Sequence, residues 1–130
     1  MEDGKAVNKL RVLYEDNHVI VVVKEKNVLS QADNTHDIDM LTIIKKYLKE
    51  KYNKPGNVYL GLVHRLDRPV SGIMVFAKTS KAASRLSDQV RKKEIKKTYM
   101  AVVKGIIKKD EDTFVDYLLK LDNGNTIVTT

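Results

Sequence analysis

The sequence contains no cysteine and no tryptophan, and only two prolines and six glycines occur among its 130 residues. Without cysteine, disulfides and thiolate metal sites are excluded. No stretch is long and apolar enough to predict a transmembrane helix, so we expect no membrane association. The histidines His18, His36 and His64 do not follow the spacing of metal ligands, which predicts no metal site. The lack of cysteine also fits a reducing compartment, and we expect a cytoplasmic protein.

Acidic residues are scarce in one part of the chain, which leaves a strongly basic region there. The whole chain carries 24 Lys and Arg against 17 Asp and Glu, a formal net charge of +7. Residues 76–110 hold eleven Lys or Arg and three acids, a local net charge of +8, so the remainder of the chain sums to −1. Such a concentration of positive charge favours a polyanionic partner. The alternative is a solvated helix face followed by a lysine-rich turn.

The length and the 42% hydrophobic content suit one domain with a hydrophobic core over residues 1–130, with residues 1–10 disordered. Apolar patterning predicts strands over 11–14, 19–23, 58–63, 72–78 and 98–103, and a strand pair over 113–121 and 126–130 joined by Asn-Gly. Helical spacing predicts helices over roughly 38–52 and after Thr79-Ser80. Because strands and helices do not alternate regularly, we predict an α+β domain with a mixed, mostly antiparallel sheet and two flanking helices.

The most informative stretch is LVHRLDRPVSGIMVFAK, residues 62–78. A His, two Arg and an Asp lie between two apolar runs that are typical of buried strands. Pro69 fixes its own φ and favours an extended Arg68, and Gly72 is expected to take a backbone conformation that other residues avoid. We therefore predict that Asp67 is held ionised on a rigid loop at the mouth of a sheet, as a nucleophile or an ion-pair anchor. The plainer interpretation is a turn residue or a salt bridge with a neighbouring Arg.

The order of these residues resembles the catalytic signature of the RluA-type pseudouridine synthases, which isomerise uridine in ribosomal or transfer RNA. The shared pattern is His-Arg-Leu-Asp, then an apolar residue, Ser-Gly, an apolar strand, Ala-Lys and a basic helix, in one register. Protein kinases carry a superficially similar His-Arg-Asp, but this chain has no Gly-rich phosphate loop. The resemblance covers about residues 12–105. It implies the family's sheet core with an RNA cleft, rRNA or tRNA as the partner, and an isomerase that needs no cofactor.

The resemblance also implies roles for single residues. Asp67 matches the catalytic aspartate, which attacks the ribose or assists an elimination there. Tyr99 matches the active-site tyrosine on which a flipped base stacks, and Arg65 matches an arginine that can replace that base in the stack. Taken singly, the plainer roles are core packing for Tyr99 and an ion pair with Asp67 for Arg65. His64 is predicted to be a hydrogen-bonded structural residue.

Basic side chains of the loop and of the basic region are predicted to contact RNA, with a solvated helix face as the alternative for those on the helix. The predicted RNA contacts are Arg65, Arg68, Arg85, Arg91, Lys92, Lys93, Lys96 and Lys97.

The sequence departs from the family pattern at two places. Lys24 matches the family, but Glu25 and Asn27 stand where Pro and Gly are usual, which predicts a loop of different shape. Family members also continue into a Thr-Gly-Arg and His-Gln-Ile-Arg type segment that supplies a basic partner for the catalytic Asp. The sequence ends at Thr130 before such a segment, so we interpret it as the front part of a catalytic domain. The alternatives are a non-catalytic RNA-binding domain, or an inactive fragment of such a synthase that lacks its C-terminal motif.

Overall fold

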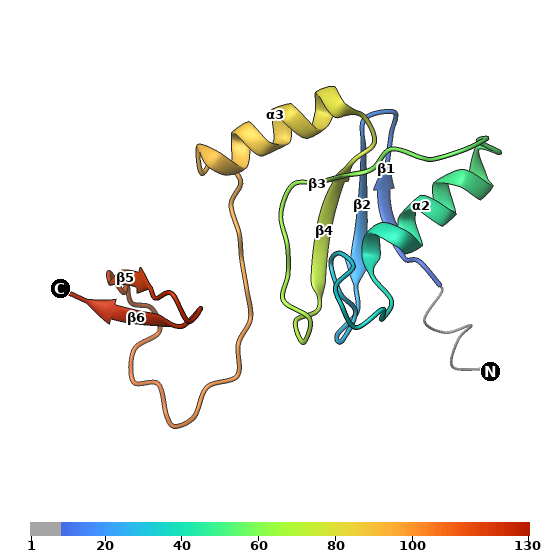
Figure 1. Cartoon of the computed structure of the whole chain (residues 1–130). Helices are drawn as coiled ribbons and strands as arrows, with labels where there is room; N and C mark the ends of the chain where they lie inside the picture. Colours follow the sequence, from blue (N-terminus) through green and yellow to red (C-terminus); the bar gives the residue numbers. More distant parts are fainter. Residues whose placement is uncertain (1–8) are drawn as a thin grey trace. The chain divides into compact units, whose positions relative to one another are not determined.

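The computed structural model describes residues 9–130 as two compact units, one ending at Lys97 and the other running from Thr98 to Thr130 (Figure 1). The expected single domain stays a prediction. The segment expected to be disordered, residues 1–10, lies mostly outside the described residues. Its last residue, Leu10, is half-buried and packs against the core of the first unit.

The first unit is built on a four-stranded sheet in the order β1-β2-β4-β3, and every pair of neighbours is antiparallel (Figure 1). In β2, Ile20 and Val22 point into the core opposite Phe76 and Met74 of β4. All four side chains are inaccessible to solvent, so these two central strands form the centre of the core. The strands are β1 (Val12–Glu15), β2 (Val19–Lys24), β3 (Gly61–Leu62) and β4 (Gly72–Ala77).

Helix α2 (Met40–Lys51) forms where helical spacing predicts it. The carboxylate of Asp39 caps it by accepting a hydrogen bond from the Thr42 amide at 3.0 Å. Its buried side chains Met40, Ile44 and Leu48 join the core of the sheet. The predicted α+β class and the mostly antiparallel sheet are thereby confirmed.

Helix α3 (Ser80–Arg91) directly follows β4 and contacts β3 and β4. The Thr79 hydroxyl caps it by accepting a hydrogen bond from the Ala82 amide at 3.1 Å. The helix approaches β3 closely at Gly61, where an added Cβ would lie 2.9 Å from the Ala83 Cβ. Glycine at this position therefore permits the helix and strand to pack.

Three predicted strands differ from the structure. The strand expected over 113–121 forms only over Tyr117–Lys120. Of the expected strand 58–63 only Gly61–Leu62 pairs with β4, although Leu60 is buried. The segment 98–103 forms no strand within the described part of the chain, and Met100 and Val102 are fully exposed. The alternation of side chains is present there, but a strand also requires a hydrogen-bonded neighbour, which periodicity alone does not supply.

The second unit contains the predicted hairpin, formed by β5 (Tyr117–Lys120) and β6 (Thr126–Thr129). The turn places Gly124 at a φ of 87°, a left-handed conformation that glycine adopts without a steric penalty. The Gly124 amide donates to the Leu121 carbonyl at 2.9 Å. The Asn-Gly signal in the sequence therefore located this turn correctly.

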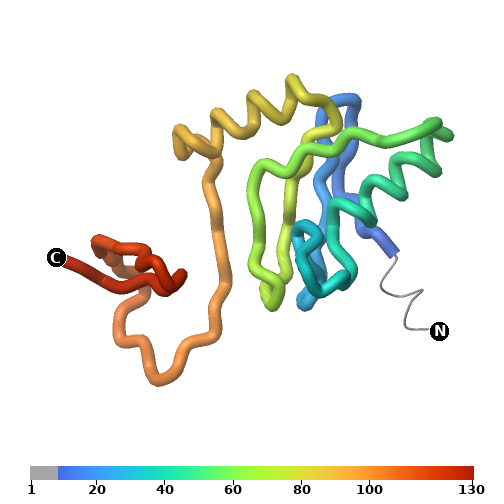
Figure 2. The backbone as a smooth tube through the Cα atoms, in the orientation of Figure 1, coloured from blue at the N-terminus to red at the C-terminus, as the bar shows by residue number. Residues whose placement is uncertain are grey.

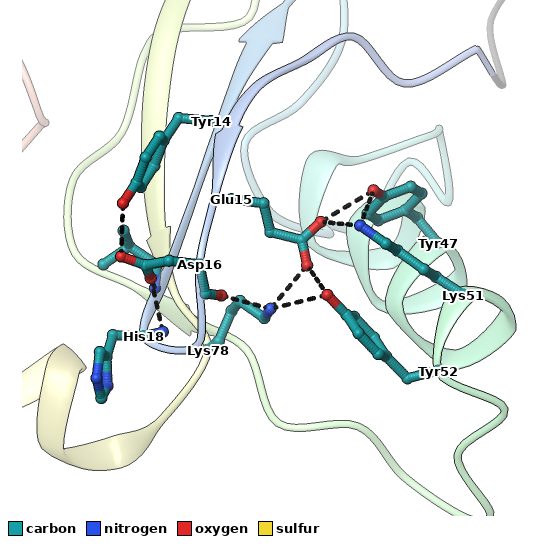
Figure 3. Close-up of polar contacts among 9 residues, drawn as sticks. Tyr14, Glu15, Asp16, His18, Tyr47, Lys51, Tyr52 and Lys78 are labelled. Atoms are coloured by element: carbon teal, nitrogen blue, oxygen red, sulfur yellow. Dashed lines mark hydrogen bonds and ion pairs between the residues drawn. The ribbon is translucent and has the colours of Figure 1, made fainter.

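Glu15 links several elements at the end of the sheet away from the β3–β4 loop (Figure 3). Its carboxylate accepts hydrogen bonds from Lys78 at 2.7 Å, Tyr47 at 2.9 Å and Lys51 at 3.0 Å, and also from the Tyr52 hydroxyl. These partners come from α2, its C-terminal cap and the residue after β4. One carboxylate thus joins β1, β4 and α2.

Candidate active site

The β3–β4 loop, residues 63–71, lies beside the segment that follows β2, residues 25–39, at the same end of the sheet (Figure 2). Five hydrogen bonds join the two. Two connect Ser30 and Leu66, one runs from the Asn27 amide to the Arg68 carbonyl, one from Arg68 Nε to the Asn27 carbonyl, and one from the Arg68 guanidinium to the Asp37 carboxylate. The paired residues are 31 to 41 positions apart in sequence, so tertiary structure alone brings them together.

Asp67 is exposed, and the peptide groups on both sides of it are anchored. On one side, the Leu66 carbonyl accepts a hydrogen bond from the Ser30 hydroxyl at 2.7 Å. On the other side, the carbonyl of Asp67 accepts from the Val70 amide at 3.0 Å, which closes a turn around Arg68. With both flanking peptide planes held, the direction in which the carboxylate leaves the backbone is restricted. This geometry supports the predicted rigid loop.

Lys24 anchors the same loop from inside the protein. Its side chain is fully buried, and its ammonium group donates to the carbonyls of Val28 at 2.7 Å, Arg68 at 3.0 Å and Glu25 at 3.1 Å. Burial lowers the pKa of Lys24, and the negative charge of Asp67 opposes that shift. A buried cation and the Asp67 carboxylate therefore interact favourably.

The two arginines of the loop are not ion-paired with Asp67 in the described chain. Arg68 instead pairs with Asp37 at 2.8 Å. Arg65 is exposed and forms no ion pair within residues 9–130. The plainer interpretation of Asp67 as half of a salt bridge with a neighbouring Arg is therefore wrong. Arg65 lines a pocket of ≈ 310 Å³, whose other lining residues are Gln31, Leu62, Val63 and His64.

His64 has the predicted structural role. Its Nε2 atom accepts a hydrogen bond from the Val75 amide of β4 at 3.1 Å, which requires an unprotonated nitrogen. Burial lowers the pKa of His64, and the positive charge of Lys97 lowers it further. A neutral His64 therefore fastens the start of the loop to β4.

Two expectations about the loop backbone change. Gly72 does not have a positive φ. Glycine is favoured there because the Leu66 side chain approaches the backbone closely: an added Cβ would lie 3.2 Å from Leu66 Cδ1. Asn27 has a φ of 67°, in the left-handed region where glycine is favoured and asparagine is tolerated. Asn27 thus takes a conformation that glycine adopts without a steric penalty.

The predicted RNA contacts of the basic region lie on α3 and directly after it, and all are exposed. Arg91 and Lys92 share an acidic partner, Asp88, which Lys92 approaches to 2.8 Å. No ion pair of Arg85 is found among the residues described. The set on α3 and its C-terminal cap is Arg85, Arg91 and Lys92, and Lys93, Lys96 and Lys97 follow.

Tyr99 belongs to the second unit, where 62% of its surface is exposed. Core packing within that unit is therefore not its role. Its assignment to the active site stays a prediction from the resemblance.

The sequence analysis did not identify Ser30, and it treated Lys24 only as a match to the family, without a role in holding the loop. A signal for Lys24 was present, because it continues the inward alternation of Ile20 and Val22 and therefore had to be buried. No comparable signal marks Ser30, a serine in an irregular segment.

Within residues 9–130, no three His, Asp or Glu side chains gather into a group that could hold a metal ion. Neither helix of this part of the chain has the length and apolar content needed to cross a membrane.

Comparison with known proteins agrees with the geometry. Residues 18–128 match the family model described as RNA pseudouridylate synthase. The chain belongs to this family. The loop that carries Asp67 and the segment that carries Ser30 both fall inside the matched region.

Several curated synthases are similar to the chain. It is 33% identical over 96 residues to "Ribosomal large subunit pseudouridine synthase C" of Buchnera aphidicola subsp. Acyrthosiphon pisum, covering 74% of this chain and 29% of that protein. It is 33% identical over 113 residues to "tRNA pseudouridine synthase C" of Pectobacterium carotovorum, covering 85% and 27%. It is 34% identical over 126 residues to an uncharacterized RNA pseudouridine synthase of Mycoplasma genitalium, covering 94% and 38%. The chain thus spans less than two fifths of the length of these relatives.

A solved structure shares the fold. "Human RNA Pseudouridylate Synthase Domain Containing 4" superposes with a TM-score of 0.57 at 20% identity, covering 72% of this chain and 33% of that chain. The likeness supports the α+β sheet described above.

Proposed function

We propose that this chain isomerises specific uridines of ribosomal or transfer RNA to pseudouridine, with the Asp67 carboxylate as the catalytic group. The observation that carries the proposal is the anchoring of both peptide groups next to an exposed Asp67, in a chain of this family. An exposed carboxylate on a restrained backbone can be presented to a substrate with little reorganisation.

The chemistry requires no oxidant or cofactor. The bond from uracil N1 to ribose C1′ breaks, the base turns, and C5 bonds to C1′; the C5 proton is lost to solvent and N1 gains one. An ionised Asp67 can assist by attacking the sugar or by acting as a base in an elimination there. We propose that Tyr99 stacks on the flipped uracil and that Arg65 takes its former place.

The basic region supports the polyanionic substrate. The side chains proposed to contact phosphate are Arg65, Arg68, Arg85, Arg91, Lys92, Lys93, Lys96 and Lys97. All of these residues except the half-buried Arg68 are exposed and thus accessible to RNA, whose backbone charge would dominate the affinity. The second candidate, an RNA-binding domain without catalysis, is favoured by the same charge and does not need Asp67.

The test uses RNA labelled with tritium at uracil C5, because isomerisation releases that tritium. Wild-type chain, Asp67→Asn and the exposed control Asp110→Asn are compared, with RNA affinity measured at several salt concentrations. Isomerisation predicts release by the wild type and by Asp110→Asn, and loss of release in Asp67→Asn with affinity unchanged. Salt-dependent binding by all three without any release would establish the binding-domain alternative.

A further inference from the structure

The side chain of Ser30 makes an unusual two-point contact with one residue of the candidate active site. Its hydroxyl donates to the Leu66 carbonyl at 2.7 Å and accepts from the Leu66 amide at 3.2 Å. A serine hydroxyl has one hydrogen and two lone pairs, so Leu66 alone takes up most of the hydrogen-bonding capacity of the Ser30 hydroxyl. Ser30 is 6% exposed, and the Met74 sulfur lies 3.7 Å from the hydroxyl on its apolar side.

The two atoms of Leu66 belong to different peptide planes. Its amide lies in the plane shared with Arg65, and its carbonyl lies in the plane shared with Asp67. One hydroxyl therefore restrains both backbone dihedrals of Leu66, and the second plane leads directly into Asp67. Since the next carbonyl, that of Asp67, is held by the Val70 amide at 3.0 Å, the Cα–Cβ bond of Asp67 has little freedom to change direction.

Ser30 is itself well fixed. The neighbouring Leu29 accepts a hydrogen bond from the Met40 amide at 2.8 Å, and its own amide donates to the Ile38 carbonyl at 3.3 Å. Val28 is buried in the core. The backbone next to Ser30 is thus joined to the start of α2 and to the core, and these elements support the hydroxyl rigidly.

We propose that Ser30 is a positioning residue for the isomerisation: it sets the orientation of Asp67 through Leu66 and so acts on the chemical step rather than on RNA affinity. The inference rests on the proposed function. Ser30 touches neither substrate nor reacting atoms, because its hydroxyl is buried against backbone. Its contribution is to keep the carboxylate within the narrow range of geometry that bond formation or proton removal requires.

The kinetic test compares Ser30→Ala, Ser30→Thr and the exposed control Ser87→Ala in the tritium-release assay. Ser30→Ala is expected to lower kcat roughly 10- to 100-fold, the cost of a misplaced reacting group, while KM stays within about 2-fold. Ser30→Thr keeps the hydroxyl and is expected to restore most of kcat; Ser87→Ala should match the wild type. A kcat unchanged in Ser30→Ala, or a loss confined to KM, would overturn the proposal.

A second readout does not depend on activity. Amide hydrogen exchange of Leu66 should accelerate roughly 2- to 10-fold in Ser30→Ala, as for loss of one hydrogen bond, while the amides of β2 and β4 exchange as in the wild type. If Ser30→Ala does not fold, Ser30→Cys keeps the volume with a weaker donor and takes its place. Unchanged exchange at Leu66 in a folded variant would show that the hydroxyl does not hold the loop.

The two proposals fail in different ways. A folded wild-type chain that forms no pseudouridine would end the proposed function and the catalytic part of this inference with it. The exchange rate of the Leu66 amide would still decide whether Ser30 restrains the loop. An active wild type with an equally active Ser30→Ala would overturn this inference alone.

Discussion

The ammonium group of Lys24 lies 3.0 Å from the carbonyl oxygen of Arg68, although the two residues are 44 positions apart. With Ser30 on Leu66, this contact places an anchor on each side of Asp67. The anchors come from a strand end and from an irregular segment, and they act on backbone atoms. The conformation of the β3–β4 loop therefore depends on the contacts from Lys24 and Ser30 as well as on the loop's own sequence.

Replacing Lys24 with Met should destabilise the first unit. The substitution keeps the apolar stem but removes the donor of three carbonyls in a site where Lys24 is fully buried. Each buried acceptor left unpaired typically costs about 1–3 kcal/mol of unfolding free energy. Urea unfolding measures the change, with the exposed Lys26→Met as the matched control, expected within about 0.5 kcal/mol of wild type. Equal stability of both variants would contradict the anchoring role.

Glu15 should make the protein sensitive to acid. Burial alone would raise the pKa of Glu15, but hydrogen bonds from Lys78, Tyr52, Lys51 and Tyr47 outweigh it and lower that pKa from 4.5 to about 2. Because the folded-state pKa is depressed, the stabilisation is present above about pH 4.5 and is lost as the pH falls towards 2.

The measurement is the free energy of unfolding from pH 7 to pH 2 for wild type, Glu15→Gln and the exposed control Glu50→Gln. At pH 7, Glu15→Gln should be less stable by up to about 3 kcal/mol, and its curve should approach the wild type as the pH falls from about 4.5 towards 2. Glu50→Gln should follow the wild type throughout. Parallel curves for Glu15→Gln and wild type would show that this carboxylate does not titrate as described.

Alanine should be tolerated differently at two glycines. At Gly61 a Cβ would meet the Cβ atoms of Ala83 at 2.9 Å and Ala77 at 3.3 Å, which are fixed to helix and strand backbones. At Gly72 it would meet only the movable end of Leu66 at 3.2 Å. Gly61→Ala should therefore cost about 1–3 kcal/mol of unfolding free energy by overpacking, and Gly72→Ala less. Thermal unfolding gives the order, and a larger cost at Gly72 would refute it.

Asp88 should restrain RNA binding. Its carboxylate pairs with both Arg91 and Lys92, and RNA phosphates would compete with it for these cations. Asp88→Asn is therefore expected to raise RNA affinity and to steepen the dependence of log affinity on log salt by up to about one unit. The control is Asp122→Asn, an exposed acid of the β5–β6 turn that should change neither. Lower affinity in Asp88→Asn would mean that its ion pairs organise the RNA-binding surface instead.

Local patterns in the sequence were enough to predict the elements that are formed by local interactions. Helical spacing predicted α2, helical spacing with a cap at Thr79-Ser80 predicted α3, and an Asn-Gly pair predicted the β5–β6 turn. The family motif assigned Asp67, and the hydrogen-bonding role of His64 was also predicted correctly. The segment 98–103 was wrongly predicted as a strand, because alternation describes side chains and not the presence of a pairing neighbour.

By itself, therefore, the sequence determined the family, the helices, the central strands and the identity of the candidate catalytic carboxylate. Only the tertiary structure decided that Arg68 pairs with Asp37 rather than with Asp67, and that Ser30 and Lys24 hold the loop. Those contacts join residues roughly 30 to 45 positions apart. The partners of Ser30 and Lys24 are backbone carbonyls and an amide, groups that almost every residue possesses. The sequence therefore contains little local signal for these contacts. They form only when folding brings the two segments to the same end of the sheet.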